Sequence, residues 1–450
     1  MNTKSDIKMD MIHGPLLIKI LKFAFPIIMG SVMQQLFSAV DIAVVGMTGD
    51  SIGQAAIGAN TTIIALFVNF FIGLSVGINV VIGNYIGSDH KEKISETVHT
   101  VILFSILSGV GILFVVELIA RPILIITSTP ADVLDMAISY LRIYACGMPF
   151  IFVYNFGTAV LRTVGDSKRP LFALMAAGVI NIVLDILLTL VLNMGVVGVA
   201  IATAFSNVIS ASIVIILLLK EKGHIRLYPR KLRIEIDCLC RVFKIGFPAG
   251  LQAIVFSVAN MCIQKTINSY GATAVAGNAI ALIFEILAFY VVTGFNQAAV
   301  TFTSQNYGAG DLARCKKVLI ITLLAAIVTT NIVNFTFIFG ENFFVRIFTA
   351  DPAVIDVVFT RFKWVLSVQF VICSYEICAS VLRGFGRSMV PAFITIFGTC
   401  VLRVIWVNTV CLRYRDIRYC FVVYPVSWFV TGTAVMTALF VVWRQLKKEN

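Results

Sequence analysis

Long apolar runs, each about the length of a membrane-spanning helix, alternate with short polar segments along the whole chain. A helix that crosses the hydrocarbon core of a bilayer needs about 20 mostly apolar residues. Runs of this kind predict spans at residues 16–45, 54–84, 98–119, 134–160, 169–192, 196–219, 241–266, 275–304, 316–340, 355–382, 389–411 and 419–443. We therefore predict an all-α membrane protein with twelve transmembrane helices.

The composition supports this fold class. Of the 450 residues, 59% are hydrophobic and only 13% are charged, whereas about a quarter of the residues of a soluble domain are charged. The longest polar stretch covers only residues 220–241, which excludes a large soluble domain. The N-terminal segment is polar and has no apolar run with a cleavage site, so we expect no removable signal peptide.

Basic residues are concentrated in alternate connections between the predicted spans. The net charge is +12, and with a cytoplasmic N-terminus 25 of the 35 Lys and Arg residues fall in segments inside the cell and 6 in segments outside. Cytoplasmic loops of membrane proteins are enriched in Lys and Arg. We therefore predict that both termini are cytoplasmic and that the protein lies in the inner or plasma membrane. The outer loop at residues 413–418, with three arginines, departs from the pattern.

The two halves of the chain resemble each other at a nearly constant offset. LKFAFP at 21–26 matches FKIGFP at 243–248, and LRTVGDSKRP at 161–170 matches LRGFGRSMVP at 382–391. Each half contains six predicted spans, so both repeats have the same orientation. Parallel repeats of this kind are typical of transporters, with the substrate path at the repeat interface. A duplicated membrane protein that transports nothing is the alternative.

The repeat predicts how the chain is divided. We expect two lobes of six helices and a cytoplasmic linker between them, at residues 1–219, 220–240 and 241–450.

Several motifs resemble those of the multidrug and toxic compound extrusion (MATE) family. They are FPIIMGSVMQQLFSAVDIAVVG at residues 25–46, AAIG shortly after it, the two loops LRTVGDSKRP and LRGFGRSMVP, and QNYGAGD at 305–311. The resemblance extends over the whole chain. It implies alternating access and an antiporter that exports cationic or amphipathic drugs in exchange for H⁺ or Na⁺.

Five polar side chains of the first half are expected to converge near the outer side of the membrane. A charge at the bilayer centre costs about 3 kcal/mol or more, so ionisable residues inside spans indicate function. The steady rise along a helix puts Asp41 and Asp185 far from the cytoplasmic ends of their spans, and Asn181 is one turn before Asp185 on the same face. Tyr140 and Thr203 lie in the outer parts of their own spans.

These groups suit a proton or a small cation. Burial and a neighbouring negative charge favour the protonated form of a carboxyl group, and oxygen ligands suit a hard cation such as Na⁺. The resemblance implies a first-lobe cation site in these helices, formed by Asp41, Asn181 and Asp185 with Tyr140 and Thr203 beside them. In the alternative interpretation, Asn181 and Asp185 only tie helices together by hydrogen bonds.

In the second half, Glu285, Glu376 and Arg403 lie inside predicted spans. Glu285 is near mid-membrane and could contact a cationic substrate, and Glu376 and Arg403 could form a structural ion pair. The NorM-like branch of the resembled family has an acidic residue eight positions after the proline of helix 7. Phe256 occupies that position here, which favours the DinF-like pattern and makes H⁺ a better candidate than Na⁺.

Two further features concern the helices themselves. Pro26 removes a backbone hydrogen bond early in helix 1 and predicts a hinge, although an ordinary proline near a helix start is the alternative. Pro248 has the same position in helix 7.

Cys411 and Cys420 flank one short loop. A disulfide between these two cysteines is the less favoured alternative to two thiols.

Other classes of function are less compatible with the sequence. No GxxxxGK[ST] motif is present, so nothing supports ATP-driven transport. The four His residues lie in the N-terminal segment, in loops or at a helix edge, which argues against an enzyme, a catalytic site or a metal centre. We expect no cofactor and no nucleic acid, but drug substrates, a coupling cation, the lipid bilayer and a monomer. A flippase for lipid-linked oligosaccharides is the main rival, although such proteins have a more cationic cavity.

Overall fold

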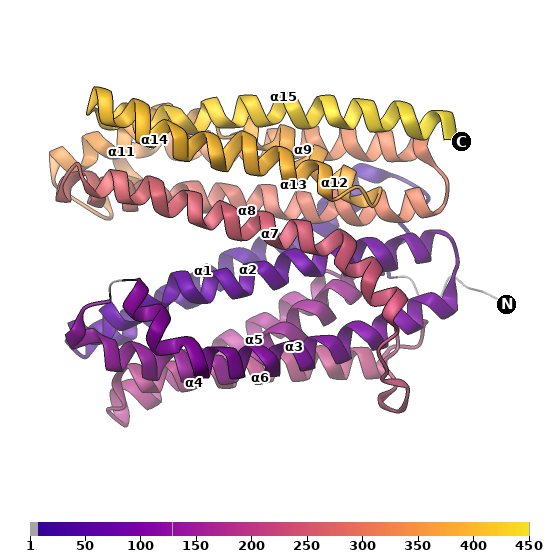
Figure 1. Cartoon of the computed structure of the whole chain (residues 1–450), viewed down its shortest axis with the longest axis horizontal. Helices are drawn as coiled ribbons and strands as arrows, with labels where there is room; N and C mark the ends of the chain where they lie inside the picture. The colour runs from indigo at the N-terminus through magenta and orange to yellow at the C-terminus, as the bar shows by residue number, and fades with distance from the viewer. Residues whose placement is uncertain (1–7, 128, 450) are drawn as a thin grey trace. The chain divides into compact units, whose positions relative to one another are not determined.

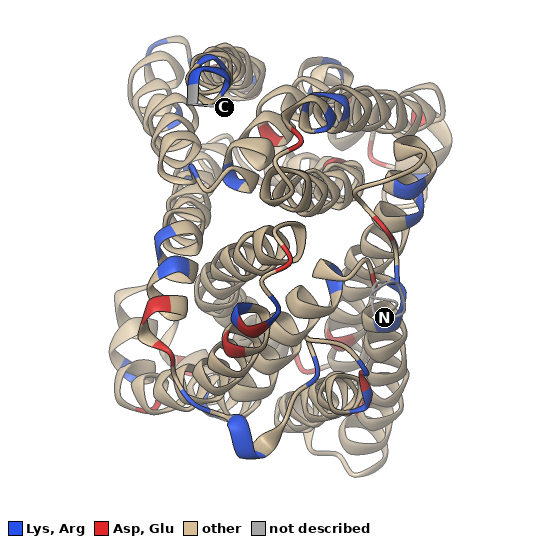
Figure 2. Ribbon diagram, turned by 90° about the vertical axis from the view of Figure 1, so that its right-hand side faces the viewer, with Lys and Arg blue, Asp and Glu red and all other residues tan. Residues whose placement is uncertain are grey.

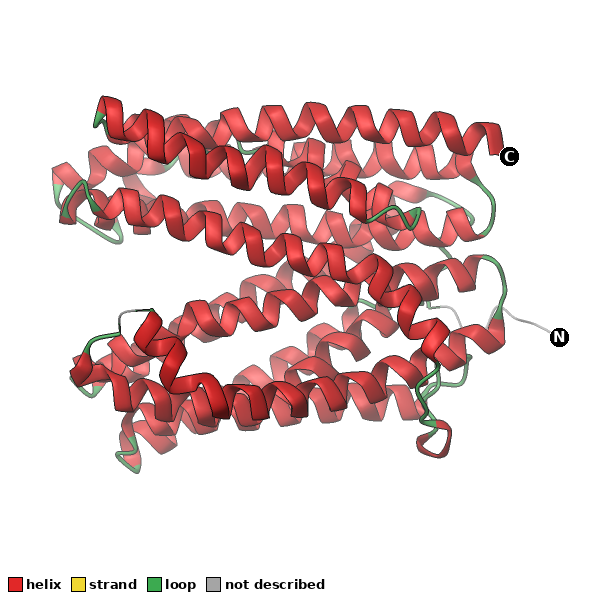
Figure 3. Ribbon diagram, viewed as in Figure 1, coloured by secondary structure: helices red, strands yellow, loops and turns green. Residues whose placement is uncertain are grey.

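The computed structural model of the chain describes residues 8–127 and 129–449, and these ranges form helices joined by short loops, without a strand (Figure 3). The helices of the first half are α1 (Leu16–Met47), α2 (Ser51–Gly87), α3 (Lys91–Ile126), α4 (Ala131–Thr163), α5 (Lys168–Asp185), the π-helical η2 (Ile186–Val191) and α6 (Gly195–Lys220). A short 3₁₀ turn, η3 (Pro229–Lys231), lies in the connection to the second half.

The second half has a similar order of elements. Its helices are α7 (Ile236–Asn268), α8 (Ala272–Gly308), α9 (Leu312–Phe339), α10 (Glu341–Arg346), α11 (Pro352–Trp364), the 3₁₀ turn η4 (Leu366–Val368), α12 (Val371–Gly384), α13 (Met389–Thr395), the π-helical η5 (Ile396–Val401), α14 (Leu402–Tyr414) and α15 (Ile417–Glu449).

All twelve predicted spans correspond to helices of this structure. Within the described ranges, eleven helices are long and apolar enough to cross a membrane, and a bent pair of helices makes the twelfth span. The prediction of an all-α membrane protein with twelve transmembrane helices in two related halves is confirmed.

The tenth span differs from its prediction because it bends by 43° between Pro352–Val368 and Val371–Gly384. Two hydrogen bonds connect the bent region to neighbouring helices. Asn334 of α9 donates to the carbonyl oxygen of Leu366 (3.0 Å), and Gln369 at the break donates to the carbonyl oxygen of Glu285 on α8 (2.8 Å). Polar backbone groups cannot stay unpaired in lipid, so the bond from Asn334 helps to make the break tolerable.

Two compact units are present, and two helices take part in both. Of the described residues, unit 1 contains 8–10 and the part of the chain from 25 to 247, and unit 2 contains 11–24 and 248–449. The predicted linker extended to residue 240, whereas α7 begins at Ile236 and its first part, up to Phe247, belongs to unit 1. The helices α1 and α7 therefore both pass from one unit to the other beside repeat-related prolines, Pro26 and Pro248.

Within unit 1, close packing of small residues places the beginning of α7 against α2 (Figure 1). A Cβ atom added at Gly77 of α2 would overlap the carbonyl oxygen of Val242, and one added at Gly246 would overlap backbone atoms of Leu74. Membrane helices approach closely where glycine exposes the backbone. These contacts explain why residues 236–247 belong to the unit of α2.

The fifth span of each half contains a π-helical segment. In unit 1, η2 directly follows Asp185, and in unit 2, η5 ends two residues before Arg403. Segments of π-helix are rare and occur frequently at functional sites, because the extra residue per turn changes the direction of neighbouring side chains. Both of these charged residues are buried.

Cys411 and Cys420 are thiols whose sulfur atoms lie 3.1 Å apart. The distance exceeds the S–S length of a disulfide, about 2.05 Å. Both residues are buried, and the thiol of Cys420 donates to the sulfur of Cys411.

Lys and Arg residues recur at helix ends and in loops when the helices are viewed end-on (Figure 2). The loop that departs from the charge pattern is partly neutralised, because Arg418 forms an ion pair with Asp416 (2.6 Å). Hydrogen bonds from Arg418 also hold the pKa of Asp416 below its ordinary value. The ion pair reduces the net charge of the loop, which is compatible with the outer position that we predicted for it.

The orientation of the chain is tested by labelling a cysteine at the start of α7. Cys240 is exposed, whereas Cys238 is 1% exposed and is a poor target for a reagent. We expect a membrane-impermeant maleimide to label Cys240 in permeabilised cells but not in intact cells, with Cys240→Ser as the control. Equal labelling of Cys240 in intact cells would contradict a cytoplasmic connection between the halves.

Candidate functional site

The two acidic residues of unit 1 lie on helices that are in close contact. A Cβ atom added at Gly178 of α5 would overlap the ring of Phe37 on α1, so only glycine allows this approach. Asp41 is one turn after Phe37, and Asp185 is two turns after Gly178. Since α1 and α5 run in the same direction in the predicted topology, this packing brings the two carboxyl groups to the same level.

The carboxyl groups of Asp41 and Asp185 lie within hydrogen-bonding reach of each other. Asp185 is fully buried and Asp41 is half-buried. Thr203 of α6 donates a long hydrogen bond, 3.4 Å, to Oδ2 of Asp41. Among the described residues, Oδ1 of Asp41 and both carboxylate oxygens of Asp185 have no donor.

No Lys, Arg or His of the described ranges forms an ion pair with Asp41 or Asp185. Two ionised carboxylates in contact repel each other, and a buried charge without a partner is costly. A single proton between the two groups would supply a donor and remove one negative charge. The geometry therefore leaves an excess of buried negative charge that a proton or a small cation would compensate.

Asn181 and two tyrosines complete the surroundings of the acidic pair. Asn181 is 4% exposed, and its Nδ2 has no acceptor among the described residues. Tyr140 and Tyr144 of α4 are close enough to Asp41 to interact with it electrostatically, and their rings lie 6.1 Å apart. The structure thus brings Asp41, Asp185, Thr203, Tyr140 and also Tyr144 together in unit 1, and Asn181 is one helical turn before Asp185 on α5.

Sequence analysis missed Tyr144, although one signal was available. Tyr144 is one helical turn after Tyr140, so both side chains lie on the same face of α4. A second phenol at this spacing could have been included with the first.

Glu285 in unit 2 is held by an arginine that sequence analysis did not single out. The guanidinium of Arg361, on α11, binds both carboxylate oxygens of Glu285 on α8, at 2.5 and 2.8 Å. Arg361 also donates to Asn278 and is fully buried. The carboxylate that we expected near a cationic substrate is therefore already paired with a cation of the protein.

Glu376 and Arg403 do not form the ion pair that we considered possible from the sequence. Glu376 of α12 accepts a hydrogen bond from Asn296 of α8 (2.9 Å). Arg403 of α14 donates instead to Ser427 of α15 (3.0 Å) and, at 3.4 Å, to Asn260 of α7. The two groups are on different helices, and each is turned toward other neighbours.

Pro26 lies inside the continuous helix α1, two residues after the segment 11–24 that belongs to unit 2. A proline inside a helix lacks the N–H that would bond to the preceding turn. The helix is therefore weakened where it passes between the units, and the hinge stays a prediction.

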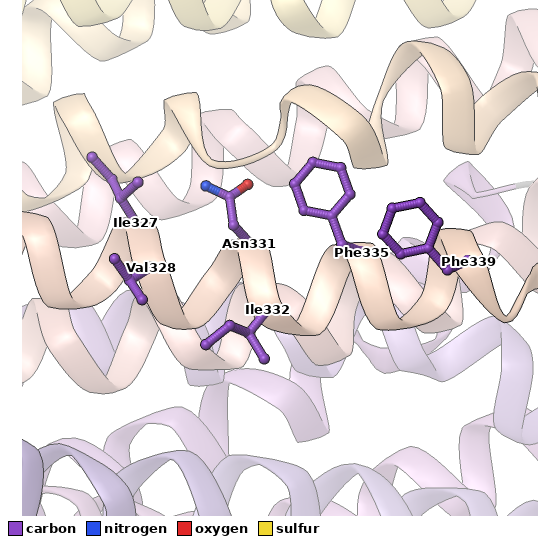
Figure 4. Close-up of a pocket in the computed structure, with 6 residues that line it drawn as sticks. All are labelled: Ile327, Val328, Asn331, Ile332, Phe335 and Phe339. Atoms are coloured by element: carbon purple, nitrogen blue, oxygen red, sulfur yellow. The ribbon is translucent and has the colours of Figure 1, made fainter.

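An apolar patch on α9 forms a shallow pocket in unit 2 (Figure 4). All of its lining residues come from this one helix, and its only polar member is Asn331. Phe335 and Phe339 stack with ring centroids 5.7 Å apart, and Phe339 is 85% exposed. A surface of one apolar helix without convergent polar groups is suited to lipid rather than to a specific ligand.

The twelve spans, the parallel repeat and the buried acidic pair define the class of membrane transporters built from two related six-helix units. The family model for MatE matches residues 26–187 and 248–407, once in each half. The chain therefore belongs to the MatE family, the multidrug and toxic compound extrusion transporters. The two matched segments begin at Pro26 and Pro248, the prolines that the internal repeat aligns with each other.

Relatives and solved structures agree with this assignment. The chain is 26% identical to the probable multidrug resistance protein YoeA of Bacillus subtilis, over 83% of this chain and 82% of the relative. It is 30% identical to the probable multidrug resistance protein YpnP of the same species, over 68% of each. A MOP superfamily transporter from Pyrococcus furiosus has the same fold, with a TM-score of 0.91 and 20% identity over 99% of this chain and 100% of that structure.

Proposed function

We propose that this protein is a multidrug efflux antiporter of the plasma membrane, which exports cationic and amphipathic compounds in exchange for protons. The observation that carries the proposal is the contact between Asp41 and Asp185, which lack a protein cation in the described ranges. The family and the names of its relatives, probable multidrug resistance proteins, support drugs as the substrate class.

The pair acts as the coupling site in this proposal. With both carboxyl groups ionised, their mutual repulsion separates α1 from α5, and their negative charge attracts a cation. With one proton bound, the two groups share a hydrogen bond and the helices pack together. Because α1 belongs to both units, a change in its packing near Asp41 is transmitted along the helix past Pro26. Alternating access then follows if each state of the pair favours one orientation of the transporter.

Sodium is the alternative coupling ion, because carboxylate and hydroxyl oxygens also bind a hard cation. Phe256 replaces the acidic residue expected for a sodium site in unit 2, and its ring faces the guanidinium of Arg403 at 5.5 Å. A cation is repelled by this guanidinium. These two observations support protons over sodium.

The flippase alternative requires a strongly cationic cavity. In unit 2, Glu285 neutralises Arg361, so that the single guanidinium of Arg403 is left in this cluster of the described residues, and the polar cluster of unit 1 is acidic. We therefore prefer drug efflux.

The function is tested by drug accumulation in a host without its own efflux pumps. Expression of the protein is expected to lower the steady-state level of ethidium, and an uncoupler that collapses the proton gradient is expected to restore it. Sodium is varied independently at constant pH. Efflux that persists under the uncoupler and stops only when ATP is depleted would count against proton exchange.

A further inference from the structure

The polar cluster of unit 1 has no acidic counterpart at the equivalent place in unit 2. When the two repeats are aligned on their shared motifs, Asp41 corresponds to Ile263 and Asp185 to Trp406. The same alignment places α4, Ala131–Thr163, over the bent span from Pro352 to Gly384. Tyr140 then corresponds to Arg361. Acidic positions have thus become apolar, and a phenol has become a guanidinium.

Two buried arginines of unit 2 lie close to the ring of one tyrosine. The guanidinium carbon of Arg361 is 4.9 Å from the ring centroid of Tyr424, and that of Arg403 is 4.4 Å from it. Glu285 neutralises only Arg361. This cluster therefore carries an excess of one positive charge.

Arg403 lacks an anionic partner in the part of the chain that the structure describes. It is 1% exposed, and its neighbours are the hydroxyl of Ser427, the amide oxygen of Asn260 and two aromatic rings. Its Nη2 has no acceptor among the described residues. Glu376, the other carboxylate of the region, hydrogen-bonds to Asn296 and interacts electrostatically with Arg383. A buried guanidinium without a counter-charge is costly in a membrane.

The residues around Arg403 are more exposed than its own side chain. Asn260, Phe256 and Tyr424 are half-buried, whereas Arg403 is 1% exposed. An anionic group that approached past these residues would find the free N–H donor at Nη2 of Arg403. If the weak bond from Nη1 to Asn260 breaks, Nη1 becomes a second donor for the same anion. Arginine binds carboxylates through two parallel N–H donors of this kind.

We propose that Arg403 is the centre of an anion site in unit 2, which binds one monovalent anionic group. The group is either free chloride or the carboxylate of a zwitterionic substrate. The chemistry is shared, because each supplies one negative charge to the guanidinium. The substrate form of the site rests on the proposed efflux function, whereas binding of a free anion does not. Together with the acidic pair of unit 1, the site would give the transporter one cation-binding and one anion-binding unit.

The site is tested by thermal unfolding of the purified full-length protein in detergent, because an anion that binds only the folded state raises Tm as its concentration increases. Sodium chloride, sodium acetate and sodium benzoate are each compared with sodium methanesulfonate, which has no carboxylate group, at equal ionic strength and pH. A rise in Tm with chloride alone identifies an inorganic anion site. A rise with acetate or benzoate identifies a carboxylate site.

Three variants locate the effect. Arg403→Gln is expected to weaken apparent anion binding by about tenfold or more, since hydrogen bonds to charged groups are strong. Arg403→Lys keeps the charge and is expected to retain part of the effect. Arg383→Gln removes another buried arginine of the same unit by the same substitution and is expected to leave the anion dependence unchanged. A wild-type Tm that does not respond to any of the three anions would overturn the proposal, whether or not Arg403→Gln folds. An equal response in wild type and Arg403→Gln would also overturn it.

A transport comparison identifies zwitterionic substrates. An amphipathic amine with a carboxylate and its methyl ester are offered to proteoliposomes. Arg403→Gln is expected to lower export of the acid relative to the ester by about tenfold. An unchanged ratio would overturn the substrate form of the site. Export of neither compound by the wild-type protein would contradict the proposed efflux function, and the anion dependence of Tm would still decide the site itself.

Discussion

Replacing Asp41 with asparagine is expected to reduce drug–proton exchange to the background of empty vesicles while the protein still folds and inserts. Asparagine has nearly the same shape as the protonated aspartate and removes the repulsion from Asp185. The pair can then no longer alternate between charged and neutral states. The Tm of the variant is expected to equal or exceed that of the wild-type protein, because a half-buried charge without a protein partner is lost.

The measurement is drug uptake into everted membrane vesicles, which corresponds to export from the cell. Uptake is compared at matched expression levels and at several pH values. Asp185→Asn is expected to behave in the same way, and the double variant to be no worse than the worse single variant, because the pair acts as one unit. Asp132→Asn, at an exposed position in the first turn of α4, is the matched control. If Asp41→Asn exported drug with the pH dependence of the wild-type protein, the carboxyl group of Asp41 would have only a structural role.

The second large effect concerns the ion pair of unit 2. Arg361→Met is expected to destabilise the protein by about 3–5 kcal/mol, because it leaves the carboxylate of Glu285 buried without its partner. The double variant Glu285→Leu with Arg361→Met removes both charges and is expected to recover most of this loss. Replacing a buried ion pair by apolar residues is often neutral or stabilising by about 1–4 kcal/mol.

Thermal unfolding in detergent measures both variants, with Arg346→Met at an exposed position of α10 as the control. The recovery in the double variant is the decisive quantity. A double variant as unstable as Arg361→Met would show that the hydrogen bonds to Asn278 and Tyr424 hold α11 in place, and not the pairing of charges.

The architecture was predictable because the length of an apolar run is fixed by the thickness of the bilayer. All twelve spans could be read in this way, and the parallel repeat followed from the motifs that the two halves share. The bend in the tenth span was not predictable from the same pattern, because it contains no proline or glycine at the break and depends on Asn334, a side chain of another helix. The passage of α1 and α7 between the units also depends on tertiary contacts such as that between Gly77 and Val242.

The candidate site was only partly predictable, for a related reason. The rise along a helix gives the depth of a residue, so Asp41 and Asp185 could be assigned to one level. It does not give the rotation of the helix, which decides the neighbour that a side chain contacts. Glu376 and Arg403 were therefore paired wrongly with each other. Arg361 was not singled out because the sequence does not show which side chain of another helix it contacts. Its partner, Glu285, lies on α8.

Proton movement in purified proteoliposomes is the most direct test of the central claim, that the Asp41–Asp185 pair exchanges protons for drug. Vesicles with a trapped pH-sensitive dye are prepared without sodium and are held at zero membrane potential with potassium and valinomycin. Addition of a cationic substrate outside is expected to drive protons out of the vesicle lumen with the wild-type protein and with Asp132→Asn, but not with Asp41→Asn. Drug uptake without a change in internal pH, or uptake that begins only when sodium is added, would contradict the claim.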